Sequence, residues 1–359
     1  MQKSSSSPFS RPVANWVLLG VFMLLVQVML GGITRLTGSG LSITEWEILT
    51  GFLPPLNASQ WETHFREYQQ TSQYHLLHAG FSLSDFKFIF FWEWFHRFWA
   101  RMVMVVFVAG FIYLFVKKQL NERIILPLLI LFLMGAMQGL IGWIMVKSGL
   151  TGDAVYVKPT KLALHFVFAM GLICYAWWFA VSLRVPGKEI VYHTGMHQWT
   201  LTIIVILFIQ LAFGALMAGH KAAAAASTWP TINGDWLPGR LWKESPPVLN
   251  LIDNPITIHF FHRSIAYLLL VLTLLWTFNI YRVTGVSHLV RKSRWLPVLM
   301  VLLQVLLGIS SVLTSPGIVA GHWGLFEWLA QLHQIVGMLF LLVMIYMLFL
   351  LRRRRPAGY

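Results

Sequence analysis

VANWVLLGVFMLLVQVMLGGI, residues 13–33, is a long apolar run without a charged side chain. A helix needs about 20 such residues to cross the hydrocarbon core of a bilayer. Similar runs recur along the 359-residue chain, at residues 95–116, 124–146, 161–183, 199–219, 258–281, 295–313 and 329–351. Only 11% of the residues are charged and 57% are hydrophobic, which excludes a water-soluble globular protein. The sequence predicts an all-α integral membrane protein with eight transmembrane helices.

The basic residues predict the orientation of these helices. Lys and Arg outnumber Asp and Glu, 27 to 13, and many of them fall on one side of the predicted membrane: Lys3, Arg11, Lys117, Lys118, Arg123, Arg184, Lys188, Arg282, Arg291, Lys292, Arg294, Arg352, Arg353, Arg354 and Arg355. Such an excess marks cytoplasmic loops beside anionic membrane lipid, so nucleic acid is not the expected partner. We expect both termini in the cytoplasm and the long loops 34–94 and 220–257 on the outer face.

The N-terminal segment favours a bacterial inner (plasma) membrane. Residues 1–11 are short, polar and cationic, and no small-residue cleavage site follows the first apolar run, so this run is predicted to be a retained helix. A long Arg-rich presequence, typical of an imported mitochondrial precursor, is missing. The single cysteine, Cys174, excludes an intramolecular disulfide and is expected to pack in the core.

An internal repeat divides the chain into two halves. The pattern Gln-x-x-x-Gly occurs once in each odd-numbered helix, at Gln27/Gly31, Gln138/Gly142, Gln210/Gly214 and Gln304/Gly308. The even-numbered helices carry histidines, and their pairs repeat at offsets of 166 and 168: His96-Arg97 with His262-Arg263, and His165 with His333. Because four is an even number of crossings, both four-helix units have the same orientation in the membrane. We therefore expect two tandem four-helix bundles related by a pseudo-twofold axis along the membrane normal.

The repeat also predicts the domain organisation. Residues 1–12 form a cytoplasmic tail, residues 13–183 the N-terminal half, and residues 184–198 a cytoplasmic linker. The C-terminal half follows as residues 199–351, and residues 352–359 form a basic cytoplasmic tail.

Four histidines are predicted to lie within the membrane, where an ionisable residue is a functional-site hypothesis by default. His96 and His262 are placed near the outer starts of their helices, and His165 and His333 in the first turns of theirs. Two imidazoles would then face each other in each bundle, an arrangement typical of axial haem ligation. The pattern favours two haem sites; zinc or copper binding, proton relays and hydrogen-bonded packing histidines are the alternatives.

The charged neighbours of these histidines suggest further roles. Arg97 and Arg263 could pair with haem propionates, or could snorkel at a helix end. Glu93 lies three residues before His96. Its counterpart in the second half, at the repeat offset of 166, is His259 and not a carboxylate. A carboxylate there could handle protons or stabilise a cationic intermediate, or it could form an interfacial ion pair with Arg97 or Lys87. This break in symmetry predicts chemistry in the N-terminal half and electron storage in the C-terminal half.

Two long motifs carry a family resemblance. Residues 31–42, GGITRLTGSGLS, and residues 86–97, FKFIFFWEWFHR, resemble the haem A synthase family, in its mitochondrial and proteobacterial branch. The resemblance spans all eight helices and includes Thr228-Trp229-Pro230 and Asn233-Gly234 in the second outer loop. The outer-loop cysteine pair of the Gram-positive branch is missing here, which excludes a thiol relay.

The resemblance implies that a methyl group of haem O is oxidised to the formyl group of haem A for cytochrome oxidase assembly. It further implies haem O synthase and oxidase assembly factors as partners, with quinol a candidate electron donor and a homo-oligomer a candidate assembly. The implied site residues are His96 and His165 as ligands of the substrate or product haem, His262 and His333 as ligands of a haem B cofactor, and Glu93 at the reaction centre. The family usually has Gln at the position of His259, which makes His259 an alternative ligand; the repeat favours His262.

Two other classes of function fit the four histidines. A dihaem b-type cytochrome would shuttle electrons from quinol, but it assigns no purpose to Glu93 or to the long first loop. A haem carrier would bind haem exchangeably. Prenyl transfer to haem is disfavoured because no paired aspartate motif for a magnesium diphosphate is present. His75 and His78, in the first outer loop, are interpreted as surface histidines.

Overall fold

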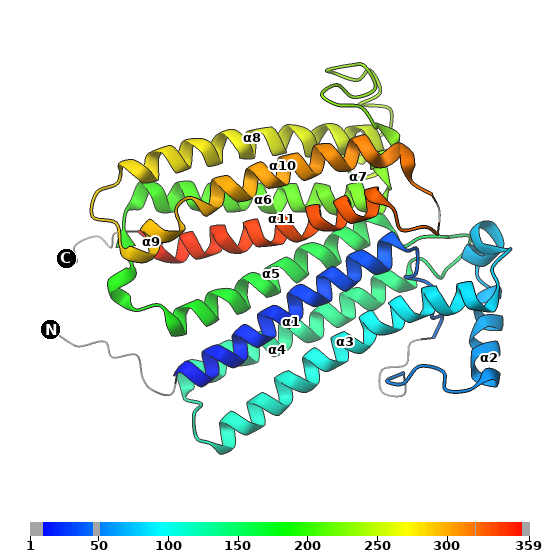
Figure 1. The fold of residues 1–359 in the computed structure, drawn as a ribbon, viewed down its shortest axis with the longest axis horizontal. Helices are drawn as coiled ribbons and strands as arrows, with labels where there is room; N and C mark the ends of the chain where they lie inside the picture. The colour runs from blue at the N-terminus through cyan, green and yellow to red at the C-terminus, as the bar shows by residue number, and fades with distance from the viewer. Residues whose placement is uncertain (1–9, 46–50, 320, 354–359) are drawn as a thin grey trace.

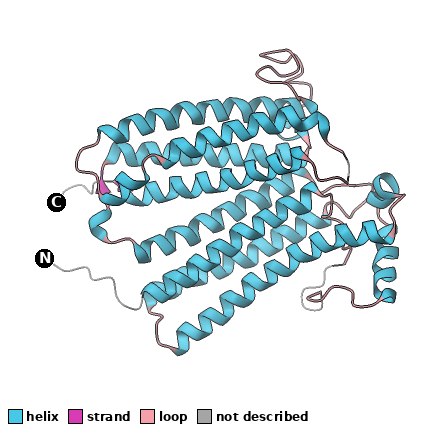
Figure 2. Ribbon diagram, viewed as in Figure 1, coloured by secondary structure: helices cyan, strands magenta, loops and turns pink. Residues whose placement is uncertain are grey.

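The computed structural model describes residues 10–45, 51–319 and 321–353, and helices dominate it (Figures 1 and 2). Eight helical spans in these residues are long and apolar enough to cross a membrane. Their helices are α1 (Ser10–Leu36), α3 (Leu83–Val116), α4 (Glu122–Lys147), α5 (Pro159–Arg184), α6 (Thr194–Gly219), α8 (Pro255–Arg282), α10 (Leu296–Thr314) and α11 (Leu325–Leu350). The predicted all-α, multi-pass architecture is confirmed.

The shorter elements lie between these spans. They are α2 (Ala58–Gln69), the π-helix η1 (Tyr74–His78), α7 (Asn250–Asp253), α9 (His288–Ser293), and the 3-10 helices η2 (Gly187–Glu189), η3 (Ala222–Ala225), η4 (Pro247–Leu249) and η5 (Ser315–Gly317). The strands β1 (Val191–Tyr192) and β2 (Leu351–Arg352) pair in parallel. This pairing joins the linker between α5 and α6 to the end of α11, at the end of the molecule where α1 begins (Figure 1).

Helix α3 begins at Leu83, so the predicted start at residue 95 is wrong. Ser82 caps the helix: its side chain accepts a hydrogen bond from the Asp85 backbone, and the Asp85 carboxylate accepts one from the Ser82 backbone at 2.9 Å. Phe86 and Phe90 then pack against the rings of α2. Local capping and tertiary packing thus extend this helix beyond its membrane span. The predicted loop 34–94 is therefore partly helical, and His96 lies well inside α3, away from its start.

Helices α8 and α11 are among those that begin earlier than their apolar runs, which start at residues 258 and 329. Asn254 accepts hydrogen bonds from the backbone of Ile256 and Thr257, which starts α8 at Pro255. Glu327 accepts from the Gly324 backbone at 2.9 Å and starts α11 at Leu325. The predicted place of His333 in a first turn is therefore wrong, because it follows Leu325 by about two turns.

The helices of the two halves form two neighbouring groups. In Figure 1, α1, α3, α4 and α5 lie in the lower part, and α6, α8, α10 and α11 in the upper part. The groups meet through contacts of α5 with α6 and α11, and of α1 with α11. The main apolar core lies along these contacts and includes Cys174, which is buried as expected.

The two groups differ in how closely their second and third spans pack. Helices α8 and α10 pack side by side, whereas α3 and α4, both wholly within the described residues, make only sparse contact. Helix α4 carries Gly135 and Gly139 where the repeat places Val301 and Val305 in α10. A Cβ on either glycine would meet no described atom within 4 Å, while Val301 is buried. Smaller side chains therefore accompany the looser packing in the N-terminal half.

Candidate functional site

Each glycine of the four Gln-x-x-x-Gly segments lies directly against an imidazole. A Cβ built on these glycines would lie 2.9–3.3 Å from the nearest ring atom, in the pairs Gly31 with His96, Gly142 with His165, Gly214 with His262 and Gly308 with His333. Any larger residue would have to displace the ring or the helix. The glycine in each segment is thus needed for the close approach of a histidine from the next transmembrane helix.

The glutamines of the C-terminal half contact the ring nitrogens. Gln304 Nε2 lies 3.1 Å from His333 Nε2, and Gln210 Nε2 lies 3.4 Å from His262 Nε2. The two rings come from α11 and α8, and their centroids are 6.3 Å apart. The structure therefore brings together the histidines that the repeat pairs in this half.

In the N-terminal half each glutamine donates a hydrogen bond to the backbone carbonyl of its histidine. Gln27 Nε2 donates to the His96 carbonyl at 3.2 Å. Gln138 Nε2 donates to the His165 carbonyl at 3.1 Å and lies 3.2 and 3.3 Å from the two ring nitrogens.

Several polar atoms at these contacts have no hydrogen-bond partner within the described residues. They include the Oε1 atoms of all four glutamines and Nδ1 of His262 and of His333. Buried polar groups in folded proteins are normally paired with protein or water. A ligand that binds the imidazoles would be expected to change these contacts.

His259 occupies the position that the repeat equates with Glu93. It is fully buried, and neither ring nitrogen has a hydrogen-bond partner in the part of the chain that the structure describes. Gln210 and Gly214 both lie against His262, one turn further along α8. The contacts that recur at the other three histidines are therefore made by His262.

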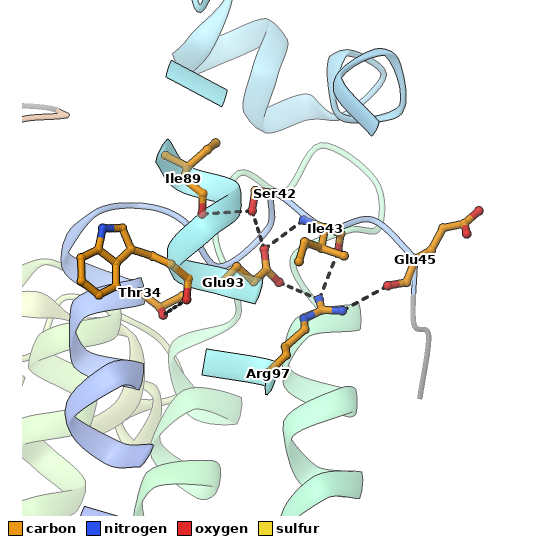
Figure 3. Close-up of polar contacts among 8 residues, drawn as sticks. Thr34, Ser42, Ile43, Glu45, Ile89, Glu93 and Arg97 are labelled. Carbon is orange, nitrogen blue, oxygen red and sulfur yellow. Dashed lines mark hydrogen bonds and ion pairs between the residues drawn. The ribbon is translucent and has the colours of Figure 1, made fainter. Parts of the chain in front are cut away.

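Glu93 sits in a hydrogen-bonded network between α3 and the segment that follows α1 (Figure 3). Its side chain is buried, and its Oε1 lies 2.6 Å from Arg97 Nη2. Its Oε2 accepts hydrogen bonds from the Ser42 hydroxyl at 2.8 Å and from the Ile43 backbone at 2.9 Å. Lys87, the other cation considered from the sequence, lies over the ring of Trp61. The carboxylate therefore joins α3 to the segment that follows α1.

Both arginines hold the outer loop of their own half. Arg97 donates to the carbonyls of Ile43 and Glu45, each at 3.1 Å (Figure 3). Arg263 donates to three carbonyls of the second outer loop, those of Ala226, Thr228 and Thr231, at 2.8–3.1 Å. These contacts orient the loops over the bundles, and the propionate contact stays a prediction.

A small pocket of about 50 Å³ opens beside the Glu93 network. Its lining includes Arg97, Arg101, His64 and the rings of Phe90 and Trp94. Cationic and aromatic side chains thus line the same hollow at the outer end of α3.

Of the two histidines of the first long loop that were interpreted as surface residues, only His75 fits that interpretation. His75 is exposed, while His78 is half-buried, stacks on Phe81 and bonds Tyr68 through Nδ1 at 2.5 Å. Burial, with a smaller effect of Lys221, lowers the pKa of His78. No group of three metal-binding side chains occurs in residues 10–45, 51–319 and 321–353.

Comparisons with known proteins match almost the whole chain. The profile of the cytochrome oxidase assembly protein family matches residues 14–345. The haem A synthase of Beijerinckia indica subsp. indica is 39% identical over 337 residues, covering 92% of this chain and 90% of that protein. The haem A synthase of Rhodospirillum centenum is 39% identical over 320 residues, covering 87% of this chain and 83% of that protein. The chain belongs to the haem A synthase family.

The two motifs that resemble this family meet in space at the Glu93 network. Ser42 is the last residue of the first motif, and Glu93 and Arg97 belong to the second (Figure 3). Gly31, which opens the first motif, lies against His96 of the second. Sequence reasoning missed Ser42 and the Ile43 backbone as partners of Glu93. The repeated Gln-x-x-x-Gly spacing was the signal for the glutamine contacts, but it does not name the histidine that each segment meets.

Proposed function

We propose that this protein is a haem A synthase, which oxidises a methyl group of haem O to the formyl group of haem A for cytochrome oxidase assembly. The curated relatives carry this name over most of their length. The observation that carries the proposal is the buried Glu93 carboxylate, one turn from His96 in the N-terminal half. A plain dihaem cytochrome has no use for a carboxylate beside one histidine pair and an imidazole, His259, beside the other.

The residues of the C-terminal half fit a haem B cofactor. His262 and His333 would hold its iron: imidazole is a usual ligand of haem iron, the ring centroids are 6.3 Å apart, and Nδ1 of each ring has no hydrogen-bond partner within the described residues. Gly214 and Gly308 keep the space around the two rings free of side chains. When bound, haem B supplies one-electron transfer. The equivalent residues of the N-terminal half, His96 and His165, would hold the iron of the substrate or product haem.

The loose packing of α3 on α4 supports placing the substrate in the N-terminal half. Haem O carries a farnesyl tail and must enter and leave through lipid, whereas a resident cofactor can stay enclosed. The N-terminal half has sparse contact between these two helices, and the C-terminal half has close packing between α8 and α10. We place the haem O tail toward lipid at this side.

Glu93 is the residue that we assign to proton handling. Conversion of a methyl to a formyl group removes hydrogen from the reacting carbon, and a carboxylate near that carbon can accept a proton. Arg97 and Ser42 hold the two oxygens of Glu93 in place. Arg97 and Arg263, each beside a candidate iron ligand, are assigned to haem propionates at the outer surface.

The charge distribution supports a location in a bacterial inner membrane with both termini in the cytoplasm. Eight spans return the chain to the side on which it started, and α1 begins where α11 ends (Figure 1). We propose quinol as the electron donor, haem O synthase and oxidase assembly factors as partners, and a homo-oligomer as the assembly.

The test is extraction of haem from detergent-purified protein made in a host that supplies haem O, followed by chromatography and mass spectrometry. We expect haem A or a hydroxylated precursor beside haem B, and a loss of haem A in Glu93→Ala with haem B retained. Haem B alone, in the presence of haem O, would favour the electron-shuttling cytochrome. Haem that exchanges freely and is never modified would favour a carrier.

A further inference from the structure

The second outer loop turns back along the side of α8. Trp229 Nε1 donates a hydrogen bond to the hydroxyl of Tyr267 at 3.0 Å, and Tyr267 lies about three turns inside the start of α8. Closer to that start, the ring of Trp242 packs edge-on against the ring of Phe261, with centroids 6.4 Å apart. In Figure 1 the loop, coloured yellow-green, projects sideways from the bundle beside this end of α8. Residues 226–242, called the Trp loop below, therefore contact the side of the helix.

The length of α8 indicates how deep these contacts lie. The helix has 28 residues and is about 42 Å long, whereas the hydrocarbon core of a bilayer is about 30 Å thick. The helix ends at Arg282, on the predicted cytoplasmic side, so the surplus length lies at its outer end. Counting back about 20 residues from Arg282 places the outer edge of the hydrocarbon near Arg263. Tyr267 then lies about one turn inside this edge, where Trp229 meets it.

The side of α8 around Tyr267 is the side that faces lipid. Tyr267 is exposed, and so are the apolar side chains of Leu268, Val271 and Leu275 further along the helix. Trp229 is exposed as well. The Trp loop thus continues the lipid-facing surface of α8 toward the outer side of the membrane.

The backbone of the Trp loop is bonded as a position near lipid requires. Arg263 donates to three of its carbonyls. The Asn233 amide donates to the Ala225 carbonyl at 2.9 Å, and the Thr228 hydroxyl donates to the Thr231 carbonyl at 2.8 Å. Irregular backbone at membrane depth is tolerated only where the protein satisfies its polar groups. These bonds meet much of that requirement for the first part of the loop.

The second part of the Trp loop presents large apolar side chains. Trp236 is 73% exposed, Leu237 70% and Trp242 59%. Exposed apolar patches mark interaction sites with protein or membrane. Tryptophan is enriched at the membrane–water interface, because its ring is apolar and its N–H is polar. The composition of the patch and its continuity with the lipid-facing side of α8 both favour lipid as the partner.

The first outer loop has a smaller counterpart. Phe52 packs edge-on against Phe98 of α3, with ring centroids 5.4 Å apart, and the nearby Leu53 and Leu56 are exposed. The repeat places Phe98 at the position of Ser264 in α8. An apolar outer segment therefore lies beside the same level of the second span in both halves.

We propose that the Trp loop anchors the C-terminal half in the outer leaflet of the membrane. Trp236, Leu237 and Trp242 insert at the interface, with the indole rings at the level of the headgroups and the leucine toward the acyl chains. The anchor fixes the loop that Arg263 holds. It is independent of haem binding and of the proposed reaction.

The test measures the depth of a nitroxide label in the full-length protein, reconstituted in phosphatidylcholine nanodiscs. The single cysteine, Cys174, is buried, so a cysteine introduced at the surface can be labelled selectively. Trp236→Cys and Leu237→Cys are labelled separately, so each variant keeps the other anchoring side chains. Electron paramagnetic resonance then compares collisions of the label with oxygen, which concentrates in lipid, and with a water-soluble nickel chelate. We expect the ratio of oxygen to nickel collisions to exceed that of Glu62→Cys, on the exposed side of α2, and to approach that of Leu275→Cys.

The unsubstituted protein, treated with the same label, gives the background from Cys174. Ratios at both loop positions equal to that of Glu62→Cys would place the loop in water and overturn the anchor. Labels shielded from both reagents, with spin–spin broadening between copies, would overturn it in favour of contact with a second copy of the chain. Shielding without broadening would overturn it in favour of packing within the chain.

Discussion

Gln334 of α11 donates a hydrogen bond to the Val28 carbonyl of α1 at 2.9 Å. Gln334 follows His333, and Val28 follows Gln27, so this contact links the histidine of one half to the glutamine segment of the other. Gln331 makes a second bond of the same kind, to Met29. The repeat places Ala163 and Phe166 at the equivalent positions of α5, and neither has a side-chain donor. The junction between α1 and α11 therefore has no repeat-related counterpart at these two positions of α5, although Trp177 of α5 donates to the Leu342 carbonyl of α11 at 3.1 Å.

Removal of this junction is expected to lower stability without removing either histidine pair. Gln334→Leu leaves the Val28 carbonyl without its partner, and hydrogen bonds between transmembrane helices contribute about 0.6 to 1.7 kcal/mol. We expect a decrease of about 1 kcal/mol in the free energy of unfolding, measured by denaturant titration in detergent. Gln198→Leu, at an exposed position of α6, serves as the control. Equal stability of the two variants would contradict a role of Gln334 in joining the halves.

The glycines against the imidazoles should not tolerate a methyl group. In Gly308→Ala the new Cβ would lie 3.0 Å from His333 Cε1, so the ring must move. We expect weaker hemin binding in the C-terminal half, measured by absorbance titration. Gly20→Ala is the control, because no described atom lies within 4 Å of its Cβ. There the substitution should be neutral or stabilise the helix by up to about 1 kcal/mol. Identical behaviour of both variants would exclude the close approach seen here.

The ion pair between Glu93 and Arg97 should show strong coupling in a double-mutant cycle. Both side chains are largely buried, and their closest atoms are 2.6 Å apart. Removing one partner leaves a buried charge, which costs about 3 to 5 kcal/mol. Glu93→Leu should therefore be more destabilising than the double variant Glu93→Leu with Arg97→Leu, with a coupling energy of about 1 to 3 kcal/mol. Strictly additive losses would mean that Glu93 does not depend on Arg97.

Larger side chains on α4 should impede the substrate half selectively. Gly139→Leu adds a bulky group to α4 at a position where a Cβ meets no described atom within 4 Å, so we expect slower conversion of haem O with an unchanged content of haem B. Val305→Leu, at the repeat-related position of α10, is the matched control. It lies in the C-terminal half, away from the proposed entry of haem O, so it should not slow the conversion. The ratio of haem A to haem B, measured by chromatography, should fall in Gly139→Leu and stay unchanged in Val305→Leu. A normal yield in Gly139→Leu would contradict access at this side.

The outer segment around η1 should lose stability in mild acid. Burial lowers the pKa of His78 from the ordinary value of 6.5, so the folded segment prefers the neutral ring. This contribution is present above pH 6.5 and is lost as the pH falls below it, because the unfolded segment then binds the proton more readily. Hydrogen exchange of residues 74–78 should therefore accelerate between pH 7 and about pH 5. In His78→Phe the pH dependence should be reduced, and an undiminished dependence would assign it to another group.

Much of the site could be predicted because the repeat is visible in the chain. The spacing of His96, His165, His262 and His333 indicated two pairs, and the structure brings His262 and His333 together. The sequence left Arg97 and Lys87 open as partners of Glu93. Along α3 only Arg97, four residues further on, is within reach, because Lys87 is six residues away on another face. The start of α3 was also missed, because its capping residue and its packing on α2 lie outside the membrane-spanning run.

The sequence by itself determined the class of the protein, the number of its spans and the repeat. Hydropathy is a local property, and the lack of water in a bilayer requires every spanning segment to satisfy its own backbone, so long apolar runs must be helices. Only the tertiary structure decided which atoms meet. The Ser42 and Ile43 contacts of Glu93, the placement of each Gln-x-x-x-Gly segment against one imidazole, and the loose packing of α3 on α4 all join residues from different helices. Such contacts depend on how the helices pack together, which no single apolar run encodes.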